Sequence, residues 1–554
     1  MSLRLVISRS GAKRRVTRVK KFLYLIWDKK LTVSRAAIIL GVSSLVSNIL
    51  GLFRERLIAG HFGASHETDI FYASFRIPDL IFNILILGAL SSVFIPIFVE
   101  KLTENKKKEA ESLANSFLNF ILIFAAVFGV VIFILAPKLV PFLLPGFFSQ
   151  DIETDIHTYN TTVNVVRLML LSPIFFSISG IFGGILNSHK RFIAYSLAPI
   201  IYNISIILSM IFLVDRVNPE IYAPTFGVVI GALMTALIQL PSTIRTGWRW
   251  RPVIDFKKGE IANIIKMMTP RTLTIGVSQI NIVVDTIVLS FFVGGISVFN
   301  YANNIQTVPT VIFGIAIATA IFPALSESFA KKDMDEFIDS FSWSARRILF
   351  FMIPATIGII VLRAQIVRLI FGIGNFDWEA TYWTTKSLLF FSFGLVAQGL
   401  IPLLLRAFYA IQDTKNPFYI GVLVMAVNAI LSVVFPFVPA LGLGVAGVAL
   451  AFSIAGIVNA VLLTIVLHEK VGILDPNHKI FESTTRLIIA SVFMGIVVHY
   501  SLYLFDAVTN THKVAGLFFQ TSGSIALGGL CYFFLAWLFK CEEIKFVLEK
   551  VRRK

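Results

Sequence analysis

A small set of polar side chains interrupts long apolar stretches of this sequence. In the N-terminal part, Ser47 and Asn48 precede Arg54 on one apolar stretch, and Asn83 lies on the next. A charge in an apolar layer costs several kcal/mol unless it meets a partner or a cavity, so such residues are candidates for binding. Ser47 lies seven residues before Arg54, on the same face of a helix. The alternative is that Arg54 only caps this helix at the outer membrane interface.

Arg271 is the second candidate cation. It follows Pro270 inside a later apolar stretch, where Gln279 continues the polar set, and Asn304 lies on the stretch after it. The guanidinium stays charged at accessible pH, and its planar fork suits bidentate binding of phosphate. The alternative is that Arg271 reaches the cytoplasmic interface and only anchors its helix. Together with Arg54, it favours an anionic substrate.

One acidic residue lies deep in the same stretch as Arg271. Asp285 follows it by about four helical turns, so it should pair with a cation, be protonated, or bind Na⁺ or H⁺. Asn428 and Ser453, on two later apolar stretches, could supply oxygens for a Na⁺ site. Asn and Ser more commonly join membrane helices by polar contacts. Na⁺ or H⁺ is therefore the candidate coupling ion, and no other cofactor is expected.

Several classes of function are excluded by motif and composition. The sequence has no Walker A motif, no His-Glu-x-x-His and no Gly-x-Ser-x-Gly, so neither ATP hydrolysis nor another enzymatic activity is expected. Its two cysteines are too few for a disulfide framework or a metal site. With 56% hydrophobic and 15% charged residues and a mean hydropathy of +0.82, the chain is too apolar for a soluble protein. The net charge of +17 therefore indicates no nucleic-acid partner, because its distribution along the chain fits a membrane.

The elements that position these residues are predicted to be transmembrane helices. A spanning helix needs about 20 mostly apolar residues. Windows of that length number fourteen, and they lie at roughly 33–53, 77–100, 111–136, 161–187, 191–214, 223–244, 262–292, 298–326, 340–363, 383–411, 417–436, 441–467, 482–505 and 514–539. The predicted fold class is an all-α polytopic membrane protein.

The basic residues test this count, because Lys and Arg accumulate in cytoplasmic loops. About three quarters of the 49 Lys and Arg residues lie in the N-terminal segment, the even-numbered loops and the C-terminal tail. The odd-numbered loops hold only eight, namely Arg54, Arg56, Arg76, Lys138, Arg216, Arg363, Arg368 and Lys513. Both termini are therefore predicted to be cytoplasmic. Residues 1–32 form a basic segment that either lies on the anionic inner leaflet or is a disordered tail.

An internal repeat predicts two lobes. Pro96-x-x-x-Glu100 recurs as Pro323-x-x-x-Glu327, and a basic turn at Lys190 recurs at Lys415 with nearly the same offset. We therefore expect pseudo-symmetric six-helix lobes at 33–250 and 251–470, followed by two extra helices and a basic tail in 471–554. A duplication of this kind is typical of transporters with a substrate cleft between the halves.

Several motifs resemble one known family. These motifs are SNILGLFRE at 47–55, FGA at 62–64, TD at 68–69, FRIPDL at 75–80, GALSSVFIP at 88–96, GGILN at 183–187, VSQI at 277–280, and the stretch from Gly314 to Ser328. They are similar to the MurJ family of lipid II flippases, within the multidrug/oligosaccharidyl-lipid/polysaccharide exporter superfamily. The family has fourteen helices, the last two added to a two-lobed core.

The resemblance implies a function and a location. It implies transport of lipid II, the undecaprenyl-pyrophosphate-linked peptidoglycan precursor, from the inner to the outer leaflet of a bacterial cytoplasmic membrane. Lipid II and membrane lipids would be the partners, and a monomer is the favoured state. By position, Arg54 and Asp69 match charged residues that matter in the family. The family commonly has Arg where this chain has Asn48 and Asn304, and at or beside Asn83.

Those departures remove positive charge from the expected cleft, and Arg271 could take over part of the pyrophosphate binding. Four other functions remain open. A flippase for another polyprenyl-pyrophosphate-linked glycan would share the cleft but normally lacks the two extra helices. A cation-coupled multidrug exporter would favour an acidic cleft. A membrane-embedded glycosyltransferase would need carboxylates near a membrane face, such as Asp69 and Asp79. The last is a signalling or structural protein that no longer transports.

Overall fold

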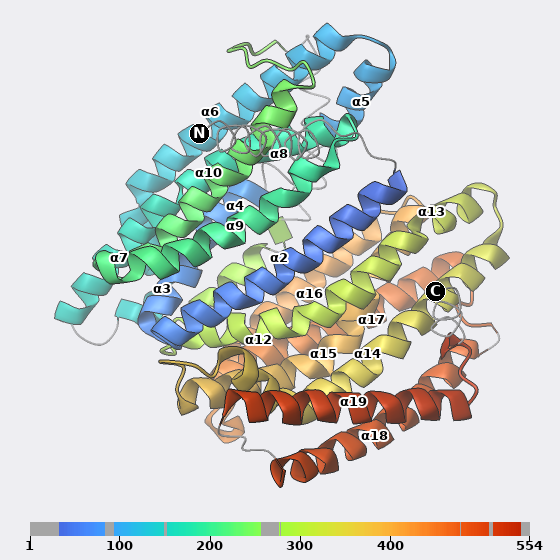
Figure 1. The fold of residues 1–554 in the computed structure, drawn as a ribbon. Helices are drawn as coiled ribbons and strands as arrows, with labels where there is room; N and C mark the ends of the chain where they lie inside the picture. Colours follow the sequence, from blue (N-terminus) through green and yellow to red (C-terminus); the bar gives the residue numbers. More distant parts are fainter. Residues whose placement is uncertain are drawn as a thin grey trace, which may run out of the picture. The chain divides into compact units, whose positions relative to one another are not determined.

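The computed structural model is helical throughout its described part and contains no strand there (Figure 1). It describes residues 33–83, 94–148, 152–255, 276–277, 279–476, 478–508 and 513–544. In these ranges, 12 helices are long and apolar enough to cross a membrane, and they match twelve of the predicted spans. The other two, at 77–100 and 262–292, run partly outside the described residues. This architecture confirms an all-α polytopic membrane protein.

The chain divides into two compact units. Unit 1 contains the described residues of Met1–Ile58 and Ile70–Gln279, and unit 2 contains those of Ala59–Asp69 and Ile280–Lys554. The division at 250/251 into equivalent lobes stays a prediction.

The helices up to Ile244 are α2 (Val33–Phe62), α3 (His66–Ser74), α4 (Arg76–Phe82), α5 (Ile95–Thr103), α6 (Lys107–Leu143), α7 (Ile152–Met169), α8 (Leu171–Ser188), α9 (Phe192–Leu213) and α10 (Tyr222–Ile244). A short helix at Gln279–Leu289 begins at the last residue of unit 1 and continues into unit 2. Unit 2 then contains α12 (Gly295–Pro309), α13 (Ala316–Ala330), α14 (Met334–Phe371), α15 (Trp378–Ala410), α16 (Lys415–Val434), α17 (Val445–Val471), α18 (Lys479–Asp506) and α19 (Val514–Leu538).

The core of unit 1 lies between α5, α6 and α8. Phe94, Phe117 and Phe182 are buried there, and the indole of Trp248 packs edge-on against Phe182 with ring centroids 5.5 Å apart. Asn119 on α6 donates to the backbone carbonyls of the segment after α10. The amide of this polar α6 residue is therefore paired, and it fixes the segment after α10 against α6.

A close approach of two helices shapes the middle of unit 2. A π-helical segment, Thr310–Ile315, joins α12 to α13. A Cβ atom at Gly314 would lie 2.7 Å from the carbonyl oxygen of Gly399 on α15, so the contact requires a residue without a side chain. Small residues at such crossings are how membrane helices approach each other. The stretch from Gly314, which carries part of the family resemblance, thus has a packing role.

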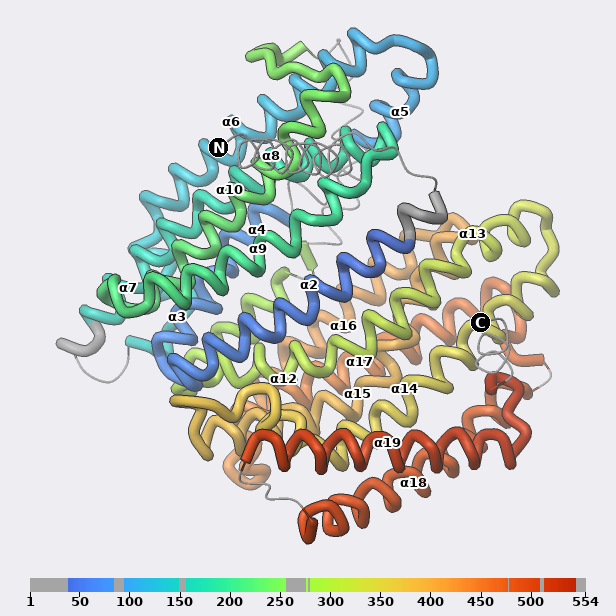
Figure 2. Tube along the Cα trace, viewed as in Figure 1, coloured from blue at the N-terminus to red at the C-terminus, as the bar shows by residue number. Residues whose placement is uncertain are grey.

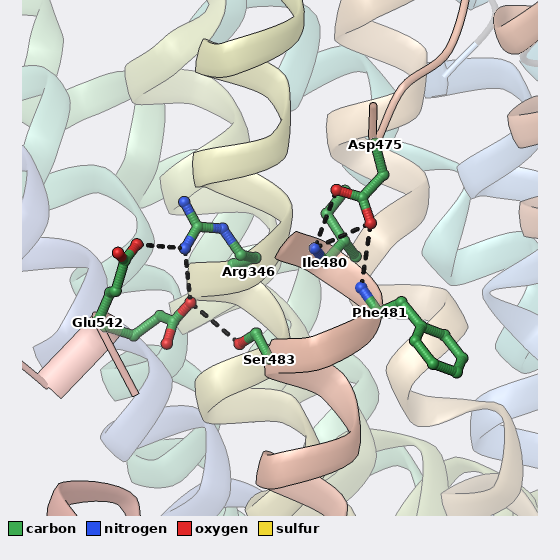
Figure 3. A network of polar contacts seen from close by, with 7 residues as sticks. Arg346, Asp475, Ile480, Phe481, Ser483 and Glu542 are labelled. Carbon is green, nitrogen blue, oxygen red and sulfur yellow. Dashed lines mark hydrogen bonds and ion pairs between the residues drawn. The ribbon is translucent and has the colours of Figure 1, made fainter. Parts of the chain in front are cut away.

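Helices α18 and α19 lie side by side and pack on α14 (Figure 1 and Figure 2). Arg346 of α14 donates to Glu542 and Glu543, at 2.9 Å and 3.3 Å, in the segment after α19. Glu543 also accepts from the hydroxyl of Ser483 at the start of α18 (Figure 3). In the same view, the carboxylate of Asp475 caps the first turn of α18. One polar cluster therefore ties both C-terminal helices to α14.

Helix α2 carries a stripe of exposed apolar side chains. On α2, the exposed side chains Ile38, Val42, Leu45 and Ile49 follow each other at spacings of three and four residues. A stripe of this length on a helix surface is expected in contact with lipid and not with water.

Candidate functional site

Helix α2 places the first candidate cation beside a polar side chain of α9. Arg54 donates through Nη1 to Oδ1 of Asn203 over 3.0 Å. Asn203 in turn donates through Nδ2 to the hydroxyl and the backbone carbonyl of Ser47, each over 3.1 Å. Ser47 and Arg54 are therefore joined through Asn203 on one face of α2.

The charge of Arg54 is compensated on its own helix. Its Nη2 contacts the carboxylate of Glu55, which also accepts from the phenol of Tyr72 on α3. The Glu55 side chain is 4% exposed and that of Arg54 is 22% exposed, so the pair is largely out of solvent. Nε of Arg54 is buried with no hydrogen-bond partner in the described part of the chain. One N–H of the guanidinium is thus left for a water or a ligand.

Asp69 lies at the N-terminus of α12. Its Oδ1 accepts from the backbone N–H of Ser297 over 2.7 Å, and the side chain is fully buried. Burial raises the pKa of Asp69 to about 8, against the opposing effect of the hydrogen bonds from α12. The TD motif at 68–69 therefore caps a helix in this structure.

The neighbouring family motif also has a packing role. The hydroxyls of Thr68 and Tyr301 both donate to the carbonyl of Gly63, each over 3.1 Å, and Gly63 has a left-handed φ of +68°. The backbone N–H of Asn375 donates to Gly60 over 2.8 Å. The segment 59–69 is fixed to α12 and to the turn after α14, which explains why it belongs to unit 2.

Two of the three residues predicted for an ion site, Asp285 and Asn428, lie together in unit 2. Oδ1 of Asp285 accepts from the hydroxyl of Ser432 over 2.7 Å and lies 3.4 Å from Nδ2 of Asn428, both on α16. Oδ1 of Asn428 is buried and has no hydrogen-bond partner among the described residues. Ser453 instead donates to the carbonyls of Phe390 and Phe391 on α15. The structure therefore joins Asp285 with Asn428, while Ser453 ties α17 to α15.

The remaining candidates are less constrained. Asn48 is exposed on α2, and Asn83 is half-buried after α4. Gln279, the last residue of unit 1, and Asn304 of unit 2 are also half-buried. None of these four side chains makes a hydrogen bond to another described residue. Arg271 lies outside the described residues.

Sequence reasoning missed the partners that hold these side chains. Asn203 and Ser432 are single polar residues in apolar helices, and this intramembrane polarity was the available signal. Glu55 is adjacent to Arg54, but adjacency alone predicts no ion pair on a helix. Tyr72 carried no signal, because only the fold brings its hydroxyl to Glu55.

Comparison with known proteins identifies the family. The chain is 27% identical to the lipid II flippase MurJ of Burkholderia cenocepacia over 514 residues, covering 92% of this chain and 96% of the relative. It is 30% identical to a probable lipid II flippase MurJ of Vibrio cholerae over 472 residues, covering 84% and 89%.

Solved structures agree with these relatives. A structure of the lipid II flippase MurJ in an inward closed conformation aligns with a TM-score of 0.74 at 27% identity, covering 92% of this chain and all of that one. An inward-facing multidrug resistance MATE transporter aligns at 0.63 and 14% identity over 80% of this chain and 99% of its own, a likeness of fold alone. The family model described as lipid II flippase MurJ matches residues 58–519. With fourteen predicted spans and a match over most of its length, the chain belongs to the MurJ family.

Proposed function

We propose that this protein flips lipid II from the cytoplasmic to the outer leaflet by alternating access. The observation that carries the proposal is the family match over residues 58–519, together with relatives of nearly the same length. The family consists of flippases and is not a class of enzymes. The resemblance drawn from the sequence motifs leads to the same function.

Arg54 is the proposed ligand of the pyrophosphate. It lies largely buried on α2, is held in place by Asn203 and Glu55, and keeps an N–H without a partner in the described part. A fixed guanidinium loses little conformational freedom on binding, and phosphate oxygens accept its N–H groups in pairs. Glu55 balances the charge of Arg54 when no substrate is bound.

Arg271 is the proposed second cation. The chain has Asn48, Asn83 and Asn304 where the family commonly has arginines, so its substrate phosphates would meet fewer fixed charges. Arg271 would supply one of the missing charges from a position that is not usual in the family. This assignment rests on the sequence alone.

The proposed coupling ion is Na⁺, with H⁺ as the alternative. A carboxylate, an amide oxygen and a hydroxyl are the hard oxygen donors that such a cation prefers, and Asp285, Asn428 and Ser432 supply one of each. The unpaired buried Oδ1 of Asn428 supports this fit, because a buried acceptor without a partner is costly. A bound Na⁺ would bind Asp285 and α16 together, and the membrane potential could then contribute to the driving force.

The proposed setting is the bacterial cytoplasmic membrane. The twelve described spans and the family place the protein in a membrane as a multi-pass chain. Both termini are proposed to be cytoplasmic, from the distribution of basic residues. Lipid II and the surrounding lipids are the proposed partners, and a monomer is the proposed state.

The test is lipid II translocation in proteoliposomes under an imposed membrane potential. Wild type should translocate, and a variant carrying Arg54→Ala and Arg271→Ala should lose both translocation and lipid II binding. A wild type that neither binds nor moves lipid II, but moves another polyprenyl-pyrophosphate-linked glycan, would redirect the proposal to that glycan. Single Arg271→Ala with undiminished transport and binding would remove Arg271 from the site.

A further inference from the structure

A groove of about 900 Å³ lies in unit 2, between α14, α18 and α19. Its apolar wall is formed by Ile357 and Val361 of α14 and by Val492 and Ile496 of α18. Val492 and Ile496 are each 47% exposed. None of the candidate pyrophosphate or ion ligands lines this groove.

The lining becomes polar toward the C-terminal ends of both helices. On α14, the apolar residues are followed by Arg363 and Arg368; on α18, they are followed by His499, Tyr503 and Asp506. The change occurs along both helices in the same direction. The groove therefore has an apolar part and a polar end, as a phospholipid does.

The polar end is basic. Arg363 and Arg368 line the groove together with one carboxylate, that of Asp506. Arg368 also lines an adjoining pocket of about 300 Å³ with Lys513 and Asp377, so three cations meet two carboxylates here. The guanidinium of Arg368 makes no hydrogen bond or ion pair within the described part of the chain. Nη1 of Arg363 donates to the carbonyl of Ile360 and leaves other N–H groups for a ligand.

These cations are unusual for their side of the membrane. The sequence places only eight basic residues in the odd-numbered loops, and three of them are Arg363, Arg368 and Lys513. The positive-inside tendency makes outward cations rare. Their collection around one groove therefore calls for an anionic occupant.

We propose that the groove is a binding site for an anionic glycerophospholipid of the outer leaflet. Its phosphate would lie between Arg363 and Arg368, and its acyl chains would lie along Val361 and Ile496 toward the middle of the membrane. Arginine is suited to phosphate, and basic pockets between membrane helices bind anionic headgroups. The apolar wall favours a lipid over a free anion.

The lipid would complete the attachment of the C-terminal helix pair. The Arg346 cluster ties α14 to the start of α18 and to the segment after α19 (Figure 3). The groove lies at the other ends of α14 and α18. A lipid in this groove would hold the two ends together by its headgroup and fill the space between them.

Purified full-length protein, depleted of lipid in detergent, tests the proposal. Phosphatidylglycerol and phosphatidylcholine are titrated in micelles, and the unfolding temperature and the lipid retained in native mass spectra are measured. Wild type should be stabilised by phosphatidylglycerol more than by phosphatidylcholine. Arg363→Gln with Arg368→Gln should weaken phosphatidylglycerol binding by about tenfold or more.

Two further variants sharpen the result. Arg216→Gln removes another exposed outward arginine and should leave the response unchanged. Ile496→Trp fills the apolar wall and should weaken phosphatidylglycerol binding although both arginines remain. The proposal is overturned if phosphatidylglycerol stabilises the double arginine variant as much as it stabilises wild type. It is also overturned by stabilisation by inorganic phosphate alone to the same extent, which would make the site an anion site and not a lipid site.

Discussion

Each unit of this protein holds an arginine against a buried glutamate, and the two pairs are built differently. In unit 1, Arg54 pairs with Glu55, the next residue on the same helix. In unit 2, Arg346 pairs with Glu543, which lies beyond α19, and Ser483 of α18 shares that carboxylate. The first pair leaves its arginine 22% exposed, and the second leaves it 10% exposed.

The difference separates a binding role from a structural one. Arg346 joins three parts of the chain, so moving it would release α18 and α19 from α14. Arg54 could exchange its contact with Glu55 for an anionic ligand while Glu55 keeps its bond from Tyr72. A buried arginine in a membrane protein is therefore not a substrate ligand by burial alone. What matters is whether its partners are needed to hold helices together.

Removing Arg346 should have the largest effect. Arg346→Gln leaves the buried Glu543 without its cation, which should lower the free energy of unfolding by about 3 kcal/mol. The measurement is thermal or denaturant unfolding of the purified protein. The matched control is Arg347→Gln, since Arg347 stacks on the half-exposed Trp343 ring and should cost about 1 kcal/mol or less. Equal losses in the two variants would remove the distinction between Arg346 and the half-buried Arg347.

Neutralising the unit 1 pair should separate stability from transport. Arg54→Gln alone leaves Glu55 buried and uncompensated, so the protein should be destabilised as well as inactive. The double change Arg54→Gln with Glu55→Gln removes both charges and should recover most of the stability. If Arg54 binds pyrophosphate, the double variant should still translocate lipid II about 100-fold more slowly, because charge-assisted hydrogen bonds are lost.

Glu55→Gln alone is the control for the double variant, because it keeps the positive charge of Arg54. Lipid II binding should persist in this variant and weaken about 100-fold in the double variant. Recovery of transport together with stability in the double variant would show that Arg54 is a structural residue like Arg346.

The sequence predicted the positions of the helices, but it did not predict the hydrogen-bond partners of the candidate residues. Apolar length fixes where a span lies, so the twelve described spans matched windows read from composition. Ser47 and Arg54 share a face because helical periodicity is local. The contacts of Asn203 and Ser432 join helices that are more than a hundred residues apart in the sequence. The contact of Tyr72 depends on the turn between α2 and α3. No pattern in the sequence specifies such contacts. Asp69 shows the converse, because its motif was visible while its contact with α12 was not.

The proposed ion site in unit 2 has a third arrangement, in which the carboxylate of Asp285 lies beside the neutral side chains of Asn428 and Ser432 on α16. If it binds Na⁺, Asp285→Asn should lower the rate of lipid II translocation about tenfold and abolish its dependence on Na⁺ concentration. The measurement is the initial rate at fixed membrane potential over a range of Na⁺.

Ser453→Ala discriminates within the predicted ion set. Ser453 bonds to the backbone of α15, so its loss should leave the Na⁺ dependence intact and reduce stability by about 1 kcal/mol. A Na⁺ response that vanishes in this variant and persists in Asp285→Asn would move the ion site from α16 to α17. A response to pH in place of Na⁺ would identify H⁺ as the coupling ion.

The smallest effect on stability is expected at an ion pair near the surface. Water weakens the attraction between the two charges there more than it does in the two buried pairs. Asp413 precedes α16, accepts from the backbone N–H groups of Lys415 and Asn416, and lies 2.8 Å from Nζ of Lys470. Burial alone would raise the pKa of Asp413, but the bonds from Lys470 and Asn416 outweigh it and lower the pKa to about 2.

Because this pKa is lower in the folded than in the unfolded state, the contribution of Asp413 is complete above about pH 4 and is lost as the pH falls toward 2. Asp413→Asn should lower the free energy of unfolding by about 0.5 kcal/mol at pH 6. Its unfolding temperature should approach that of wild type at pH 2.5. Lys470→Gln, which keeps the helix cap, should cost no more than Asp413→Asn. A difference in unfolding free energy between wild type and Asp413→Asn that grows as the pH falls would contradict the sign of this contribution. A loss of unfolding free energy as large as that of Arg346→Gln would show that solvent exposure does not weaken the Asp413–Lys470 pair relative to the buried pairs.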